Sequence, residues 1–463
     1  MKKILIILLA IITLLAVAYF GFFKYRQIQA NSFLIPSNTE SLVKINVDEL
    51  YKTIAISYLK HPEQYKGAEK KDLKQRIEDL HTGIQIPANI YLFTLKGNKE
   101  NYFTKFKIND SVAFKSFVNK HFKSIKNTAE GRHSYAQLAD SSLSLLFSNS
   151  EVVFGYHPAK KDIYPILLSV LSNQKSLNFK DSEFESLGSL SDHIAYQSST
   201  SKATINFYDG QVKFNNEFIT DQILPFEHPK HRKLNSNSPL IMWLNADFKA
   251  DVKPLAKTPS IKQNFFKFYK GYLDIEWLKS TNKKDTIISF EFNENFEQVE
   301  KKQIVDRKIP ELFINMDADA KPLVRYLTDS NLLDTQSNKI STMAIPLFQT
   351  YFQSNGNQIQ LSTVNQAPFN ADRIASDDFF YLYADFNKLF KDSSFPLVAN
   401  NLLTLKKLES KGRKTGAKKI KFETVIDFQN EKANALIQLV KMYQKLKSTP
   451  IQINFGNAMP KNQ

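Results

Sequence analysis

Residues 4–23 form an unbroken apolar run, ILIILLAIITLLAVAYFGFF, with Lys2 and Lys3 before it and Lys24 and Arg26 after it. An α-helix rises about 1.5 Å per residue, so this run would be roughly 30 Å long, which matches the hydrocarbon core of a bilayer. The pattern predicts one transmembrane helix near the N-terminus.

A cleaved secretory signal is the competing interpretation. Ile4–Leu15 would be its apolar core and Ala16-Val17-Ala18 its cleavage site. Cleavage there would leave the aromatic segment Tyr19–Phe23 facing water, whereas aromatic residues followed by cations are typical of the end of a membrane helix. We therefore favour an uncleaved signal anchor. The N-terminal lysines predict a cytoplasmic tail, and hence a single-pass inner-membrane protein whose C-terminal portion is extracytoplasmic, in the periplasm.

Four predicted strands end in the same pattern, apolar–polar–x–Asp, and a helix-like stretch follows each. They are Ile45–Asp48, Leu244–Asp247, Ile314–Asp317 and Leu382–Asp385. Asp at the start of a helix accepts hydrogen bonds from the unpaired N–H groups of the first turn. The pattern therefore predicts four junctions from strand to helix, each capped by Asp.

A second unit recurs in the order strand, polar turn, strand, Asn or Asp, helix. The predicted first copy is Asn89–Lys96, Tyr102–Ile108 and Ser111–Phe122; the second is Tyr272–Leu278, a turn at Ser280–Asp285, Thr286–Phe292 and Asn295–Ile304; the third is Leu403–Glu409, a loop at Ser410–Lys419, Ile420–Phe428 and Asn430–Leu446. Closing strands are available at Ser134–Leu138, Glu311–Met316 and Pro450–Phe455. Combined with the strand-to-helix pattern, this predicts repeated β-α-β-β-α-β modules in ferredoxin-like order, an α+β fold with largely antiparallel sheets.

Extra hairpins are predicted at Asp209-Gly210 and Asn355-Gly356. The polar segment Phe226–Ser238 has few apolar residues and predicts a domain boundary. The expected organisation is an anchor and juxtamembrane segment at 1–30, a first α+β domain at 33–228, and a second α+β region at 236–463, with a further split near 335–375.

Composition narrows the chemistry. The chain has no Cys, so disulfides, thiolate nucleophiles and zinc–thiolate sites are excluded. Its 13 Gly residues form no GxGxxG, P-loop or GxSxG motif, which excludes the Rossmann, P-loop and α/β-hydrolase classes. The net charge of +16 fits either an anionic partner or a solubilising surface rich in Lys.

The densest basic cluster lies in the predicted loop of the last copy and is the candidate contact for an anionic ligand. It comprises Lys406, Lys407, Lys411, Arg413, Lys414, Lys418, Lys419 and Lys421. Such a cluster would bind an anionic envelope polymer or lipid head groups. The alternative interpretation, a solvated loop tip, is favoured.

Other constellations favour structural roles. His228 and His231 form an H-x-x-H pair, but Pro229 separates them and cations surround them, which disfavours a metal ion. Asp317 and Asp319 are better explained as helix caps than as Ca²⁺ ligands. Phe265–Lys270 interleaves aromatic residues with Lys, yet its spacing fits a helix packed on the core, so nucleic acid is not expected. No catalytic residue, cofactor site or metal site is predicted.

The segment Ile35–Asn46 and the phrase Thr82-Gly83-Ile84 resemble a broad group of uncharacterised bacterial membrane-anchored extracytoplasmic proteins. The resemblance implies an envelope location and an α+β fold, and it supplies no catalytic residues.

These observations predict a non-catalytic binding or scaffold protein of the cell envelope. Its partner would be an anionic envelope polymer, a lipid head group or an envelope protein. Two alternatives stay open: an extracytoplasmic hydrolase acting on cell-wall or lipid substrates, and a carrier or chaperone for lipids or lipoproteins.

Overall fold

The protein is described here by a computed structural model. It describes residues 21–65, 82–122, 124–127, 132–160, 162–249, 265–292, 298–342, 345, 348–369, 372–391 and 404–448. The chain divides into two compact units. Unit 1 comprises residues 1–209 and 432–434, and unit 2 comprises residues 210–431 and 435–463. The boundary falls at Asp209-Gly210, the turn predicted from the sequence, where Gly210 has a φ of +65°.

Unit 1 begins with a helix at residues 21–30. Its further elements are β1 (Leu34–Pro36), β2 (Thr39–Asn46), α2 (Val47–Lys60), η1 (Pro62–Tyr65), β3 (Asn89–Leu95), β4 (Asn98–Lys107), α4 (Ser111–His121), β5 (Ser124–Asn127), β6 (Ser134–Gln137), β7 (Leu143–Phe147), β8 (Glu151–Tyr156), α5 (Tyr164–Leu171), β9 (Ser176–Asn178), η2 (Phe179–Asp181), α6 (Glu185–Ser189), β10 (Ile194–Ser198) and β11 (Ser201–Tyr208). The main sheet is antiparallel in the order β11-β10-β2-β3-β4-β8-β7-β6-β5.

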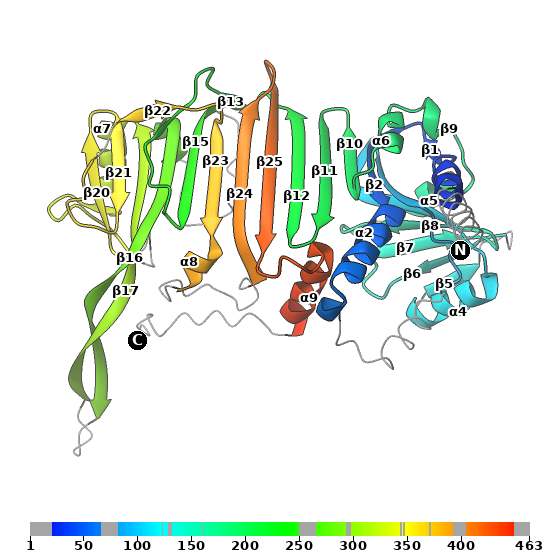
Figure 1. Ribbon diagram of the computed structural model, residues 1–463, viewed down its shortest axis with the longest axis horizontal. Coiled ribbons are helices and arrows are strands. Elements are labelled where there is room, and N and C mark those ends of the chain that lie inside the picture. Colours follow the sequence, from blue (N-terminus) through cyan, green and yellow to red (C-terminus); the bar gives the residue numbers. More distant parts are fainter. Residues whose placement is uncertain are drawn as a thin grey trace, which may run out of the picture. The chain divides into compact units, whose positions relative to one another are not determined.

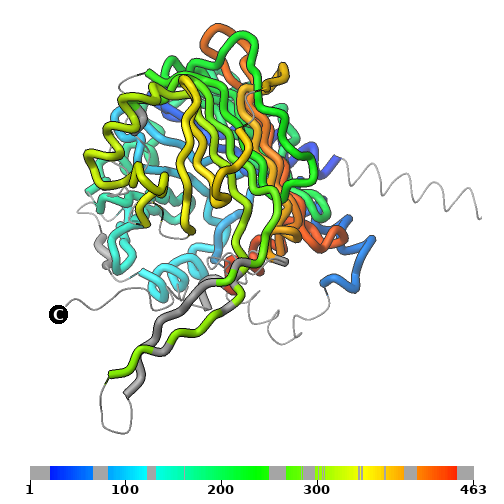
Figure 2. Tube along the Cα trace, turned by 90° about the vertical axis from the view of Figure 1, so that its left-hand side faces the viewer, coloured from blue at the N-terminus to red at the C-terminus, as the bar shows by residue number. Residues whose placement is uncertain are grey.

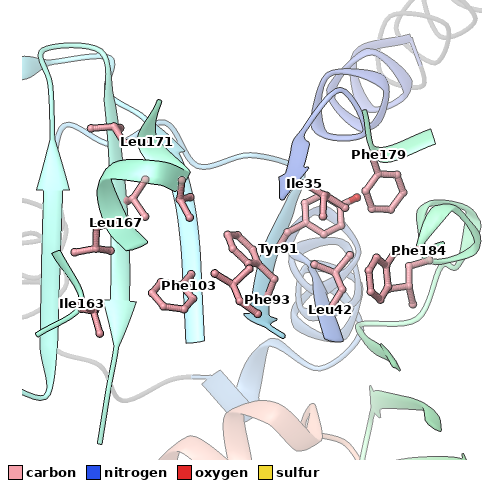
Figure 3. Packing of buried hydrophobic residues seen from close by; sticks show 14 of the residues in the cluster. Ile35, Leu42, Tyr91, Phe93, Phe103, Ile163, Leu167, Leu171, Phe179 and Phe184 are labelled. Carbon is pink, nitrogen blue, oxygen red and sulfur yellow. The ribbon is translucent and has the colours of Figure 1, made fainter. Parts of the chain in front are cut away.

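Unit 1 has a hydrophobic cluster on each face of this sheet: on β8, Val153 belongs to the cluster that contains Leu167, whereas the adjacent Val152 belongs to the cluster that contains Phe114 of α4. Figure 3 shows Phe93 and Phe103 from neighbouring strands between Leu167 on one side and Phe184 on the other. Strand β3 alternates buried and half-buried positions over its first part, as expected for a half-buried strand.

Helix α4 begins where the sequence predicts it. The carboxylate of Asp110 accepts hydrogen bonds from the N–H groups of Val112 and Ala113, both at 3.0 Å, and so caps the helix. The carbonyl of Gly83 accepts from the N–H of Asp110. At φ +70°, a Cβ on Gly83 would lie 2.2 Å from the Asp110 carbonyl oxygen, so this turn requires glycine.

Unit 2 is also built on antiparallel strands. Its elements are β12 (Gln211–Ile219), β13 (Ile223–Pro225), β14 (Lys230–Arg232), β15 (Leu240–Phe248), η3 (Phe265–Phe268), β16 (Tyr269–Phe292), β17 (Gln298–Ala318), α7 (Ala320–Asp329), β18 (Leu333–Asp334), β19 (Lys339–Ile340), β20 (Thr350–Asn355), β21 (Gln358–Ser362), β22 (Arg373–Ala375), β23 (Phe380–Asp385), α8 (Phe386–Lys391), β24 (Leu405–Lys414), β25 (Lys419–Phe428) and α9 (Ala435–Ser448). The sheet order is β12-β25-β24-β23-β15-β16-β17-β21-β20-β19-β18 (Figure 1). The hairpin predicted at Asn355-Gly356 joins β20 to β21.

The predicted α+β class with large antiparallel sheets is confirmed, but the ferredoxin-like strand order is not. In a split-βαβ unit, the strands on either side of the helix are parallel and another strand separates them. Here β2 pairs directly and antiparallel with β3, as β15 does with β16 and β23 with β24. The pairings therefore describe a three-stranded antiparallel meander with an insertion between its first two strands.

Several element predictions were wrong in unit 2. β16 continues through Ser280–Asp285, where a turn was predicted, and residues 298–304 of the predicted helix belong to β17. Residues 295–297 of that helix lie outside the described part of the chain. The helix expected over Phe265–Lys270 is limited to η3, because β16 begins at Tyr269. The loop expected at Ser410–Lys419 shrinks to a tight turn, because β24 continues to Lys414. Strands β16, β17 and β24 carry many charged residues in these segments. A strand is predicted from apolar residues at every second position, so that pattern is weak here.

The four repeated Asp residues have different roles. Asp385 caps α8 by accepting from the N–H of Lys388 at 3.2 Å. In α2 the cap is Asn46, which leaves the carboxylate of Asp48 to bind Arg26. Asp317 pairs with an arginine of β22, and β15 continues through Asp247.

No helix among the described residues combines the length and the apolar composition needed to cross a membrane. Residues 4–20 of the predicted transmembrane segment, like the predicted strand Pro450–Phe455, lie outside the described part of the chain. The structure thus gives no support for the anchor, which stays a prediction.

Candidate functional site

The helix at residues 21–30 contacts the rest of unit 1 through polar side chains. The guanidinium of Arg26 donates to the carboxylate of Asp48, with Nη2 2.9 Å from Oδ1, and to the carbonyl oxygen of Ile86 at 3.2 Å. Asp48 is buried. This pair therefore fixes the helix beside the first turn of α2.

Side-chain hydrogen bonds also hold Gln27 of this helix and Asn31, which directly follows it. Asn89 donates from Nδ2 to the side-chain oxygen of Gln27 at 2.8 Å. The hydroxyl of Tyr91 donates to Oδ1 of Asn31 at 2.9 Å. Asn89 and Tyr91 are buried on β3, and burial raises the pKa of Tyr91, so its hydroxyl stays a donor. The helix is therefore held by specific contacts to the sheet.

A groove of about 230 Å³ opens beside this helix. One wall comes from the helix and the turn after it, with Arg26 and Phe33; the other comes from the segment before β3 and from β4, with Ile86 and Lys107. The side chain of Ile86 is 53% exposed. The groove thus combines apolar walls with cations at its rim, although it is smaller than a typical drug-sized ligand site, roughly 300 Å³ or more.

Lys105 also lines the groove, and its charge is already paired. Its Nζ is 3.0 Å from Oε2 of Glu151, 2.9 Å from Oδ1 of Asn173 and 3.2 Å from the Leu171 carbonyl oxygen. Lys107, two residues later on the strand, is exposed. Because Arg26 is already paired with Asp48, a small anionic group with an apolar attachment would meet the exposed cation Lys107 at this groove.

The sequence alone does not reveal this groove. From the sequence, Arg26 is predicted to be a cation at the end of a membrane helix, and Asp48 is predicted to be a helix cap. One signal was available: Phe103, Lys105 and Lys107 share one face of β4 by their period of two. A lysine on the same strand face as a buried phenylalanine indicates that its ammonium group has a polar partner inside the fold.

The structure brings the eight predicted basic residues together on the β24–β25 hairpin, within strands more than in a loop. Six of them form ion pairs: Lys406–Glu431, Lys411–Glu409, Arg413–Asp378, Lys414–Glu227, Lys419–Glu217 and Lys421–Glu423. With the described residues, Lys407 and Lys418 form no such pair. Much of the positive charge is thus balanced locally, and an anionic contact at this hairpin stays a prediction.

The polar segment Phe226–Ser238 is folded into unit 2. It contains β14, which pairs with β22, and His231 stacks on Trp243 with ring centroids 3.9 Å apart. Arg232 donates to two buried carboxylates, with Nη2 3.0 Å from Asp274 Oδ1 and 3.1 Å from Glu276 Oε2. Ion pairs therefore hold this segment on the sheet. Its polar composition alone does not indicate such contacts.

The buried carboxylate of Asp274 accepts hydrogen bonds from several neighbouring side chains. Besides Arg232, it accepts from the hydroxyl of Tyr272 at 2.8 Å and from Nδ2 of Asn315 at 2.9 Å. Arg373 lies over the ring of Tyr272, 3.7 Å from its centroid, and pairs with Asp317. The cavity among these groups is about 10 Å³, so the cluster has a structural role.

A serine–histidine pair is the nearest approach to a hydrolytic site. Oγ of Ser144 lies 2.8 Å from Nε2 of His157 and accepts from the hydroxyl of Tyr135 at 3.1 Å. Both Ser144 and His157 are fully buried, and burial lowers the pKa of His157. Within the described part of the chain, Nδ1 of His157 has no hydrogen-bond partner, so no carboxylate orients the imidazole.

Among the described residues, no group of three His, Asp or Glu side chains is arranged to hold a metal ion. His228 is exposed, while Nδ1 of His231 lies 2.8 Å from the carbonyl oxygen of Arg232. The described residues thus leave the H-x-x-H pair without the convergence that a metal needs.

No protein-family model matches the sequence, and no curated protein matches it. Among solved structures, crystal form I of TP0453 is similar over 40% of this chain and 77% of that chain, with 11% sequence identity and a TM-score of 0.26. A likeness at this level assigns neither a fold family nor a function to this chain.

Proposed function

We propose that this protein is a non-catalytic binding or scaffold protein of the cell envelope. Residues 4–23 would hold it in the inner membrane as a single-pass signal anchor, with the bulk of the chain in the periplasm. The groove beside helix 21–30 would bind the anionic head group of a membrane lipid. The observation that carries this proposal is the fixed position of that groove directly after the apolar run.

The docked helix supports this placement. Residues 21–23 belong both to the apolar run and to the helix that Arg26 and Asp48 hold against unit 1. A chain leaving the bilayer at residue 23 would therefore keep the groove within a few residues of the membrane surface. The site would then meet lipid head groups before any soluble ligand.

The exposed side chains of the helix support the same view. Phe22, Tyr25 and Ile28 are 57%, 64% and 61% exposed, and Lys24 is exposed beside them. Aromatic and aliphatic side chains next to cations are typical of the membrane interface. The resemblance of Ile35–Asn46 to membrane-anchored envelope proteins agrees with this proposal.

The two alternatives have weaker support. A hydrolase would need an accessible nucleophile, and the Ser144–His157 pair is buried. A lipid carrier would need an apolar cavity larger than the groove of about 230 Å³, which has charged residues along its walls. The recurring meander instead fits a scaffold, and we propose that it reflects an internal repeat.

Photocrosslinking to lipid tests the proposed site. The full chain would be reconstituted into nanodiscs that contain a photoreactive phosphatidylglycerol, and the crosslinked residues would be mapped. We expect crosslinks at residues lining the groove, and a loss of at least about fivefold for Lys107→Glu, because the new carboxylate repels the head group. Lys202→Glu is the matched control, since Lys202 is an exposed lysine on β11.

Competition distinguishes a lipid from a soluble anion. Polyphosphate added in solution should leave the lipid crosslinks unchanged if the head group is the ligand. Equal crosslinking of Lys107→Glu and the unsubstituted protein would contradict the proposed site. Displacement by polyphosphate would instead indicate an anionic polymer.

A further inference from the structure

Strands β16 and β17 continue far beyond the sheet of unit 2. Strand β16 pairs with β15 only up to Trp277, and β17 pairs with β21 only from Phe313 onward. From Ser280 to Phe292 and from Gln298 to Pro310 the two strands pair, among the described residues, only with each other. We call these two segments the arm, which projects away from the rest of unit 2 in Figures 1 and 2.

The arm has the form of an open edge. At about 3.3 Å per residue its strands extend roughly 40 Å as a two-stranded ribbon, a structure that is marginally stable by itself in water. Its edges present unpaired backbone N–H and C=O groups, which another strand can join. Large apolar side chains are exposed there as well: Val299 by 47% and Ile304 by 69%.

The edge strand β17 is self-complementary about Ile304. Alternate residues share one face of a strand, and the series here reads Glu300, Lys302, Ile304, Asp306, Lys308, all exposed. If a second copy pairs antiparallel about a twofold axis at Ile304, Glu300 lies opposite Lys308 of the other copy. Lys302 lies opposite Asp306, and Ile304 lies opposite itself.

This arrangement reverses the usual effect of charged edges. Lysines on an edge strand normally prevent pairing with other chains. In the twofold register each of these lysines instead meets a carboxylate, and opposite charges directly across two strands stabilise the pair. Within one copy, Lys302 already lies 3.1 Å from Glu300, with both side chains largely in solvent. Because both groups are exposed, Lys302 can instead pair with Asp306 of the second copy, and Glu300 with Lys308 of the second copy.

The charge balance of the arm also favours a second copy over an anionic partner. The whole chain has a net charge of +16, whereas residues 280–310 contain six basic and six acidic residues and are neutral. A surface for an anionic polymer would be positive. A neutral surface with charges ordered about one point fits an isologous contact between identical chains.

We propose that the protein forms a homodimer through its arms, by antiparallel edge-to-edge pairing of β17 with β17 of a second copy about Ile304. The arms of the two copies would join into a four-stranded sheet. The remaining part of each chain would lie at opposite ends of that sheet.

Disulfide trapping tests this register, because the natural chain has no Cys. Directly opposite residues of an antiparallel pair have Cα atoms about 4.5–5.5 Å apart, within the range of a disulfide. We expect Ile304→Cys to give a crosslinked dimer in membranes from cells that express the full chain, under mild oxidation. Val299→Cys is the matched control, since ten residue steps would place its two copies roughly 33 Å apart.

Further variants keep the test decisive. The double variant Val299→Cys/Ile309→Cys should crosslink, because these positions lie opposite each other across the axis. Ile304→Cys should crosslink at least about tenfold more than Val299→Cys. Equal crosslinking of the two single variants, or crosslinking of neither, would overturn the proposal.

A charge swap provides an independent measurement. Lys302→Asp would set two carboxylates opposite each other twice per dimer and should weaken dimerisation at least tenfold, as measured by sedimentation of the full chain in detergent. The variant Lys302→Asp/Asp306→Lys should restore it. A chain that is monomeric at every concentration, or a swap that restores nothing, would overturn the proposal.

Discussion

The guanidinium of Arg26 binds both carboxylate oxygens of Asp48, with Nε 3.1 Å from Oδ2 and Nη2 2.9 Å from Oδ1. Planar pairing of this kind fixes orientation as well as distance. Asp48 is 6% exposed, so its carboxylate is largely shielded from solvent. The pair determines where the helix at residues 21–30 lies on unit 1, and hence the position of one wall of the groove.

Replacing Arg26 with Ala should release this helix. The substitution leaves the Asp48 carboxylate buried without its cation, at a cost of about 2 kcal/mol. We expect faster hydrogen exchange at residues 24–31 and a lower melting temperature. Arg325→Ala is the matched control, because Arg325 pairs with Asp329 on an exposed helix surface and should change stability by less than about 0.5 kcal/mol. Unchanged exchange in Arg26→Ala would contradict the docking role.

Acid should destabilise unit 1 through His193. Nδ1 of His193 accepts from the N–H of Phe207 at 2.8 Å, and Nε2 lies 2.8 Å from the hydroxyl of Thr53, so the neutral ring fits both partners. Burial lowers the pKa of His193 below 6.5, although the carboxylates of Glu49 and Asp192 oppose this shift. Below pH 6.5 the unfolded chain then binds more protons than the folded chain, and stability falls as the pH falls.

The variant His193→Gln isolates this contribution. At pH 7.5 it should be less stable by about 1–2 kcal/mol, because two hydrogen bonds are lost. The gap to the unsubstituted protein should narrow as the pH falls below 6.5 in thermal unfolding. His228→Gln, at an exposed position, should follow the unsubstituted protein throughout. A gap that stays constant with pH would show that His193 does not titrate on unfolding.

Lys44 should make the stability of unit 1 depend on pH in the alkaline range. Its Nζ donates to the carbonyl oxygens of Leu187, Gly188 and Leu190 at 2.8–3.2 Å, and the side chain is buried. Burial lowers its pKa from 10.5 to about 8. Between pH 8 and 10.5 the unfolded chain holds the proton that the folded chain has released, so this group adds stability as the pH rises.

Comparison with Lys44→Met measures that effect. From pH 7.5 to pH 10.5 the unsubstituted protein should gain about 2 kcal/mol of unfolding free energy relative to the variant, in denaturant titrations. The exposed Lys202→Met should show no such change. An identical pH dependence for Lys44→Met and the unsubstituted protein would exclude a lowered pKa for Lys44.

Asp274 should be essential to the stability of unit 2. Its carboxylate is 0% exposed and accepts from Arg232, Tyr272 and Asn315. Asp274→Asn would leave the largely buried guanidinium of Arg232 without a full partner and should cost about 3–5 kcal/mol. Asp329→Asn, on an exposed helix surface, should cost little. A melting temperature for Asp274→Asn equal to that of the control would refute this role.

The sequence predicts local elements well where one pattern dominates. Asp110 predicts the start of α4, and Asn355-Gly356 predicts the β20–β21 hairpin; both are confirmed. These signals work because a cap or a turn depends on a few adjacent residues. The α+β class follows from the alternation of strand-like and helix-like stretches for the same reason.

The groove and the charge cluster depend instead on pairs of distant residues. Arg26 and Asp48 are 22 residues apart, and Arg232 and Asp274 are 42 apart. Neither partner carries a local signal that distinguishes it from a solvated charge. The strand order could not be predicted either, because a helix between two strands is compatible with parallel and antiparallel neighbours.

Accessibility of single cysteines tests most directly the claim that residues 4–23 anchor an extracytoplasmic body. The exposed Lys202→Cys and the tail variant Lys2→Cys would be treated, in intact spheroplasts, with a maleimide that cannot cross membranes. We expect labelling of Lys202→Cys before lysis and of Lys2→Cys only after lysis. Labelling of Lys202→Cys only after lysis would contradict that claim.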